Sequence, residues 1–145
     1  MAFKSIAIAA DHAGFDLKAK LAEVLRSSGY EVLDLGTKDA TTSVDYPDFG
    51  KAVAEAVTGG KADAGVVVCG TGIGISIAAN RHPGIRAALC HDETSARLCR
   101  EHNDANVLAL GARLIGEVVA ADCLQAFLTT EFAGDRHARR IKKLG

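Results

Sequence analysis

The stretch VVVCGTGIGISIAAN, residues 66–80, decides how the rest of the chain is interpreted. Its opening run of valines is typical of a strand that is covered on both faces of a parallel sheet. Three glycines follow at alternate positions, so the chain can turn tightly there and its backbone can approach a ligand closely. The apolar residues after the turn predict a helix. The segment therefore indicates an α/β protein in which Cys69 lies at the end of a strand.

The alternation of strand and helix continues in both directions from this segment. Apolar runs predict strands at residues 5–10, 30–36, 64–69, 84–90 and 106–111. Helical spacing and end signals predict helices at residues 15–29, 48–60, 72–80, 92–102, 117–132 and 135–144. Strands and helices that alternate in this way form a parallel sheet through right-handed crossovers. We therefore expect a single Rossmann-like domain over residues 1–145, a three-layer α/β fold with about five parallel strands between helices.

The composition argues against several classes of function. The 145 residues carry a formal net charge of −1, so the chain has no broad basic field for nucleic acid or for a membrane surface. Aromatic residues make up only 5%, and tryptophan is absent, which disfavours base stacking. No apolar run reaches the roughly 20 residues of a membrane helix, and Asp11 interrupts the first run too early for a signal peptide. We expect a cytoplasmic protein that binds neither nucleic acid nor membranes.

The four cysteines follow no metal-binding or disulfide pattern. They are Cys69, Cys90, Cys99 and Cys123, without a C-x-x-C pair or a zinc-type spacing to histidine. In a reducing compartment they are expected to be free thiols, and three of them are typical of small core residues. The position of Cys69 alone allows two interpretations. It is either a small residue at a crowded strand end or a reactive thiol that the converging amides of the turn and helix activate.

The glycine turn indicates an anion pocket without matching a named motif. Gly70, Gly72 and Gly74 form the pattern G-x-G-x-G before a helix N-terminus, where free amides point at a ligand. Ile75 stands where a dinucleotide fingerprint needs glycine and where a cysteine phosphatase loop needs arginine. The lysine of a P-loop is missing, and Val68 occupies the acidic position of the methyl-donor pattern. An anion-binding turn with a thiol at its edge remains.

Further polar residues follow the predicted strands, at the sheet edge where open α/β sheets bind ligands. Asp11 and His12 come directly after the first strand, although Asp11 is also suited to cap the following helix. Tyr46 lies in the loop region after the second strand. Arg113 follows the fifth strand and is a candidate phosphate ligand.

Two other groups of residues lie away from that edge. His102 and Asn103 precede the fifth strand, so they can share a site with the residues above only if they reach it from a second subunit. Arg136 and Arg140 are one helical turn apart and would suit a phosphate. A basic helix at a chain end is also commonly no more than a solvated surface.

In order along the chain, five segments resemble the ribose-5-phosphate isomerase B family, which includes galactose-6-phosphate and allose-6-phosphate isomerases. The segments are ADHAG (10–14), VDYPDF (44–49), CGTGIGISIAAN (69–80), REHNDANVLALGAR (100–113) and GDRHARR (134–140). The resemblance implies a Rossmann-like homodimer or homotetramer that shares each site between two chains. It also implies that no metal and no organic cofactor takes part.

The resemblance further implies a role for each matching residue. Cys69 would be the base that moves a proton between two carbons, and His102 would assist opening of the sugar ring, with Asp11 nearby. Thr71 would hold the enediolate oxygen together with the loop amides. The phosphate would be bound by His12, Arg113, Arg136 and Arg140. The implied substrate-binding residues are Asp11, His12, Tyr46, Gly70, Gly72, Ile73, Gly74, Asn103, Arg113, Arg136 and Arg140.

The expected activity is therefore the interconversion of ribose 5-phosphate and ribulose 5-phosphate. The residues at the implied catalytic positions do not separate this substrate from allose or galactose 6-phosphate, because pocket length depends on loop packing. A non-catalytic phosphosugar-binding module is a more remote alternative. Such a module would keep the arginines but would not need Cys69, Thr71 and His102 together.

Overall fold

The computed structural model describes residues 3–145, whose five strands form one sheet. The strands are β1 (Ser5–Ala10), β2 (Glu31–Asp34), β3 (Ala64–Cys69), β4 (Ala87–Leu89) and β5 (Val107–Gly111). Their order in the sheet is β2-β1-β3-β5-β4, and every neighbouring pair is parallel. The expected parallel sheet is confirmed.

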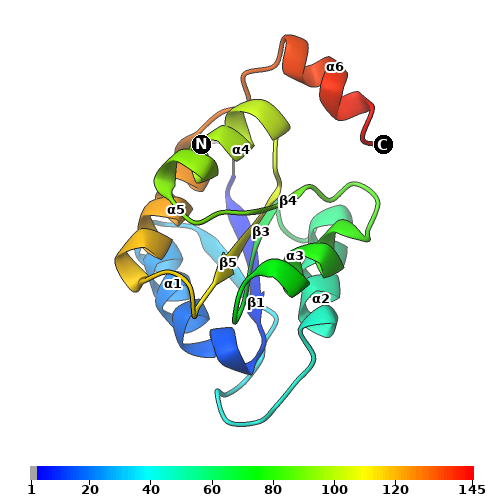
Figure 1. Ribbon diagram of the computed structural model, residues 1–145. Coiled ribbons are helices and arrows are strands. Elements are labelled where there is room, and N and C mark those ends of the chain that lie inside the picture. The colour runs from blue at the N-terminus through cyan, green and yellow to red at the C-terminus, as the bar shows by residue number, and fades with distance from the viewer. Residues whose placement is uncertain (1–2) are drawn as a thin grey trace.

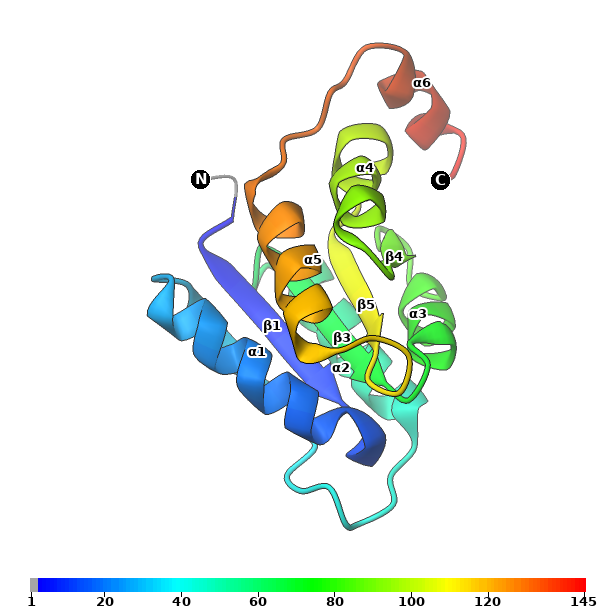
Figure 2. The ribbon, with the colours of Figure 1, turned by 60° about the vertical axis from the view of Figure 1, so that its left-hand side comes forward.

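Helices cover both faces of this sheet. They are α1 (Phe15–Ser27), α2 (Tyr46–Thr58), α3 (Ile73–Asn80), α4 (Glu93–Asn103), α5 (Glu117–Thr129) and α6 (Arg136–Lys142), with a short 3₁₀ turn at His12–Gly14. Figures 1 and 2 show α1, α4 and α5 on one face and α2 and α3 on the other. The arrangement confirms the expected three-layer α/β fold. Helix α6 lies apart from these layers, beyond the end of α4.

The alternation of side chains along the central strands creates two apolar cores. In β3, Val66 and Val68 pack under α1 and α5, whereas Val67 and Cys69 face α2 and α3. All six residues of β3 are buried. The valine run therefore forms a strand covered on both faces, as its composition predicts.

The boundaries of several elements differ from those that the sequence predicts. Helix α2 begins at Tyr46 and not at residue 48, because Pro47 is tolerated in the first turn, where its missing N–H has no helical partner to lose. Strand β4 is shorter than the predicted 84–90. Its pairing with β5 begins only at Ala87, because the N–H of Arg86 bonds the side-chain oxygen of Asn106 at 2.8 Å. On the outer edge of β4, the side chain of Asn80 bonds both the N–H and the carbonyl of Ala87, at 2.7 and 2.9 Å, in the place of a neighbouring strand. Among residues 3–145, no helix is long and apolar enough to cross a membrane.

The turn after β1 lies tightly against the end of β3. A Cβ atom on Gly14 would lie 2.6 Å from the carbonyl oxygen of Val68, a distance that real side chains do not adopt. The glycine therefore allows the backbone of the first turn to reach the strand that carries Cys69. The polar residues at the two strand ends are brought together by this contact.

Replacing Gly14 by alanine is expected to lower the free energy of unfolding by about 1–3 kcal/mol, because backbone atoms have to move to admit the methyl group. Gly116→Ala is the matched control, since Gly116 has an ordinary φ of −78° and no atom within 4 Å of the added Cβ. The Gly116→Ala variant loses a favourable N-cap residue, which destabilises it, but its unfolded chain is less flexible, which stabilises it. Its free energy of unfolding is therefore expected to change by no more than about 0.5 kcal/mol. Urea unfolding of both variants measures the difference. Equal stability of the two would contradict the close approach.

Candidate active site

Cys69 lies at the carboxyl end of β3, directly below the first turn of α3. It is 4% exposed, and the N–H of Gly72 donates to its Sγ at 3.2 Å. Gly72 has a φ of +77°, a conformation that favours glycine, and this allows the chain to fold back over the sulfur. The thiol is therefore held beneath the glycine turn, with one backbone donor on its sulfur.

Thr71 is the exposed residue of the same turn. Its Oγ1 accepts the N–H of Ile73 at 3.2 Å, so the hydroxyl hydrogen stays available to a ligand. The amides of Gly72 and Ile73 thus have acceptors within the turn itself. The hydroxyl of Thr71 is the donor that the turn presents to solvent.

Asp11 and His12 follow β1 and lie beside this turn. The N–H of Asp11 donates to the carbonyl of Val68 at 3.2 Å and continues the pairing of β1 with β3. Its buried side chain accepts the N–H of Gly14 at 3.1 Å, so the capping interpretation of Asp11 is confirmed. The Nδ1 atom of His12 accepts the N–H of Val44 at 3.1 Å. The neutral ring therefore carries its hydrogen on Nε2 and can donate with that atom.

Tyr46 and Arg113 complete this group of residues. The ring of Tyr46 packs on Gly74, where a Cβ would lie 2.6 Å from two ring carbons. The N–H of Arg113 donates to the carbonyl of Gly70 at 2.8 Å, and its side chain lies over the same glycine. The structure thus places Tyr46 and Arg113 at the glycine turn, as the sequence predicts.

A second group lies at the end of the molecule where α4 and α6 meet (Figure 2). His102 and Asn103 are in the last turn of α4. The ring of His102 stacks on the buried ring of His137 from α6, with centroids 4.4 Å apart. A cavity of about 320 Å³ is lined by His102, Asn103, His137 and Arg140. Burial, followed by the nearby charge of Arg136, lowers the pKa of His137.

The two groups are separated by the length of a strand. Cys69 pairs with Gly111 at the last residue of β5, whereas His102 and Asn103 precede the first residue of that strand. Five strand residues span about 15 Å. A histidine side chain cannot bridge this distance, so His102 does not reach Cys69 within one chain. The expected placement of His102 and Asn103 at the opposite edge of the sheet is confirmed.

The sequence signals do not single out His137, although it adjoins Arg136 in the basic segment. A histidine among arginines in a short helix gives no local sign of burial. Its contact with His102 depends on where α6 packs against α4, and that is a tertiary contact between segments far apart in sequence.

The remaining three cysteines are buried free thiols, as expected of small core residues. The neighbouring Cys90 thiol and burial raise the pKa of Cys99, and burial raises the pKa of Cys123 to about 12. Cys99 and Cys123 are therefore protonated at neutral pH. Within residues 3–145, no three His, Cys, Asp or Glu side chains are grouped so that they could hold a metal ion.

Several known proteins are similar to this chain over nearly its whole length. The ribose-5-phosphate isomerase B of Escherichia coli is 45% identical over 97% of this chain and 94% of its own length. A galactose-6-phosphate isomerase subunit of Clostridium acetobutylicum is 44% identical over 95% of this chain and 79% of its own length. The structure of Clostridium thermocellum ribose-5-phosphate isomerase B matches with a TM-score of 0.96 and 55% identity, covering 97% of this chain and 95% of that one.

The sequence pattern of the ribose/galactose isomerase family matches residues 6–144, which include both groups of polar residues described above. The matching region contains all six helices of the described chain and the whole sheet except Ser5, the first residue of β1. The chain therefore belongs to the ribose/galactose isomerase family.

Proposed function

We propose that this protein interconverts ribose 5-phosphate and ribulose 5-phosphate. The observation that carries the proposal is the position of Cys69, a buried thiol at the carboxyl end of β3 with the Gly72 N–H on its sulfur. Membership of the isomerase family and the 45% identity to the Escherichia coli ribose-5-phosphate isomerase B support this choice of substrate.

The reaction moves one proton between adjacent carbons. In the open-chain aldose, the thiolate of Cys69 takes the proton from C2, and the electron pair forms a C1–C2 double bond while O1 becomes an enediolate oxygen. A proton then passes from O2 to O1. The thiol returns its proton to C1, and the C2–O bond becomes the ketone carbonyl. The hydroxyl of Thr71 supplies a donor for the oxygen that carries the negative charge.

The second part of the proposal is a homodimer whose sites are shared. The α4–α6 end of one chain meets the glycine turn of the other, so that His102 assists ring opening and Asn103 binds substrate hydroxyls. Arg136 and Arg140 from that chain bind the phosphate together with His12 and Arg113. The distance of about 15 Å between the two groups within one chain supports this arrangement.

Exposed apolar side chains beside the glycine turn also support a dimer. Ile73 and Ile77 are one turn apart on α3 and are 49% and 51% exposed. Tyr46, which packs on the same turn, is exposed as well. Large apolar side chains gathered on one face are typical of surfaces that a partner covers. A second copy would cover these residues while it supplies His102.

Purified protein is expected to form ribulose 5-phosphate from ribose 5-phosphate, with the rate unchanged by a metal chelator. Allose 6-phosphate and galactose 6-phosphate, assayed in parallel, test the hexose alternatives, of which the relative from Clostridium acetobutylicum suggests galactose 6-phosphate. Turnover of a hexose phosphate alone would keep the mechanism and change the substrate. No turnover of any of the three would leave the phosphosugar-binding module as the better interpretation.

Cys69→Ala is expected to lower kcat by roughly 10²–10⁴-fold, the usual contribution of a general base, while KM changes little. Cys123→Ala is the matched control, because Cys123 is fully buried in the other core and its truncation affects only stability. Steady-state kinetics of both variants provide the comparison. A Cys69→Ala enzyme with near-normal kcat would rule out this cysteine as the base.

Mixed dimers test the shared site directly. Cys69→Ala and His102→Ala chains, each inactive as a homodimer, are given different affinity tags and purified together after co-expression. One of the two sites then contains an intact Cys69 and an intact His102, so the mixed dimer is expected to regain about half of the normal activity. A site built within one chain would regain none.

A further inference from the structure

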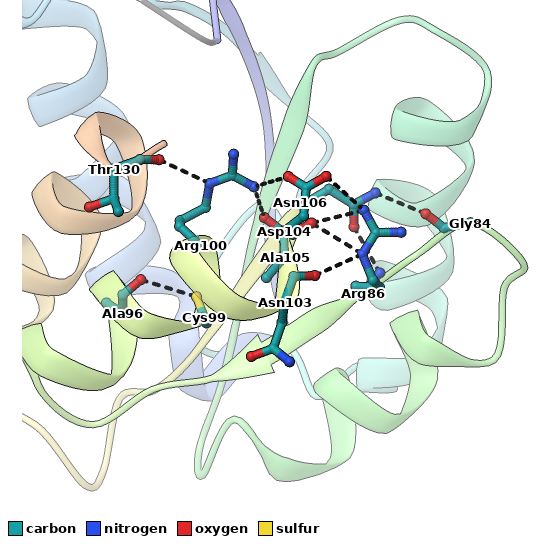
Figure 3. Close-up of polar contacts among 10 residues, drawn as sticks. All are labelled: Gly84, Arg86, Ala96, Cys99, Arg100, Asn103, Asp104, Ala105, Asn106 and Thr130. Carbon is teal, nitrogen blue, oxygen red and sulfur yellow. Dashed lines mark hydrogen bonds and ion pairs between the residues drawn. The ribbon is translucent and has the colours of Figure 1, made fainter. Parts of the chain in front are cut away.

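Two arginines hold the end of α4, as Figure 3 shows. The Nε of Arg86 donates to the carbonyl of Asn103 at 2.9 Å and to that of Asp104 at 3.1 Å. Its Nη2 donates to the Asp104 carbonyl at 2.9 Å. The last carbonyls of a helix have no intrahelical partner, so the guanidinium of Arg86 satisfies groups that water would otherwise bind.

Arg100 holds the same turn from the protein interior. Its Nη1 donates to Oδ1 of Asp104 at 2.9 Å and to the carbonyl of Ala105 at 2.6 Å, and its Nε donates to the carbonyl of Thr130 at 3.3 Å. The side chain of Arg100 is only 5% exposed, and its guanidinium lies 4.8 Å from the ring centre of Phe3. Arg100 therefore anchors the turn to the core.

Asp104 connects the two arginines. Its Oδ1 is bound by Arg100, and its Oδ2 lies 3.5 Å from Nη2 of Arg86. Asp104 has a φ of 45°, a left-handed conformation that is uncommon outside glycine and ends the helix. The backbone after Asn103 is thus fixed by four hydrogen bonds from side chains to carbonyls of three successive residues, Asn103 to Ala105.

We propose that Arg86 is a positioning residue for His102 and Asn103, an inference that rests on the shared site of the proposed function. Its guanidinium fixes the peptide plane that follows Asn103, and with it the direction in which both side chains leave α4. The side chain of Asn103 points away from the two guanidiniums in Figure 3 and is exposed. Arg86 acts from behind the turn, through the backbone, and does not touch the substrate.

The chemistry of arginine suits this task better than that of lysine. The planar guanidinium of Arg86 bonds two successive carbonyls and approaches a carboxylate at the same time, which a single ammonium group cannot do in a fixed geometry. The Arg86 side chain is 26% exposed, so its removal leaves no sealed cavity. Arg86 can therefore be changed with less damage to the fold than Arg100.

In the homodimer, Arg86→Met is expected to lower kcat roughly 10–100-fold, because small displacements of catalytic groups are costly. Arg86→Lys is expected to recover part of this loss. Arg97→Met is the matched control, because Arg97 lies on α4 with His102 and forms an exposed pair with Glu101. The kcat of this variant should stay within about twofold of normal.

Mixed dimers separate positioning from a general effect on the fold. In the pair of Cys69→Ala and His102→Ala chains, the intact site takes His102 and Asn103 from the Cys69→Ala chain. Arg86→Met on that chain is expected to remove most of the regained activity. The same change on the His102→Ala chain, whose own His102 is already absent, is expected to leave the regained activity within about twofold.

The outcomes are distinct. Loss of activity only when Arg86→Met is on the Cys69→Ala chain supports the positioning role. Equal loss on either chain, or loss on neither, overturns it, because a purely structural residue acts on both chains alike. If the parent pair without the Arg86 change regains no activity, the shared site is wrong and the positioning role fails with it.

Discussion

The common direction of the five strands is the constraint on which the rest of the structure depends. In a parallel sheet the carboxyl ends of all strands lie at one edge, so the residues after β1, β3 and β5 come together there. The same polarity sends the end of α4 to the other edge, one strand length away. A chain that needs both groups for one reaction has to bring two copies together, and in this way the shared site that we propose follows from strand direction.

Much of the fold could be predicted because its signals are local. The valine run, the glycines that follow it and the apolar helix pattern each depend on a few neighbouring residues, and β3 and α3 lie where they indicate. The errors occur where tertiary contacts decide. Strand β4 begins later than predicted, because the N–H of Arg86 bonds the side chain of Asn106. Tyr46 enters α2 because Pro47 fits a first turn, which composition alone does not reveal.

The candidate site likewise contains some residues whose positions could be predicted from local signals and others whose positions depend on tertiary contacts. Asp11, Cys69 and Arg113 could be placed from the sequence, since each lies within two residues of the end of a predicted strand and needs no knowledge of packing. The stack of His102 on His137 and the contacts of Arg86 with the end of α4 could not be predicted. They join segments that are distant in the sequence, and no periodicity or motif encodes which helix end meets which loop.

The bonds from Asn80 to Ala87 protect one edge of the sheet. The exposed edge of a sheet is a template on which another chain can add a strand, and such additions propagate into aggregates. At β4 the outward donor and acceptor of Ala87 are already occupied by an amide that acts as a one-residue imitation of a strand. A strand added at the β4 edge would have to displace both of these bonds, so this edge offers fewer free backbone groups for association.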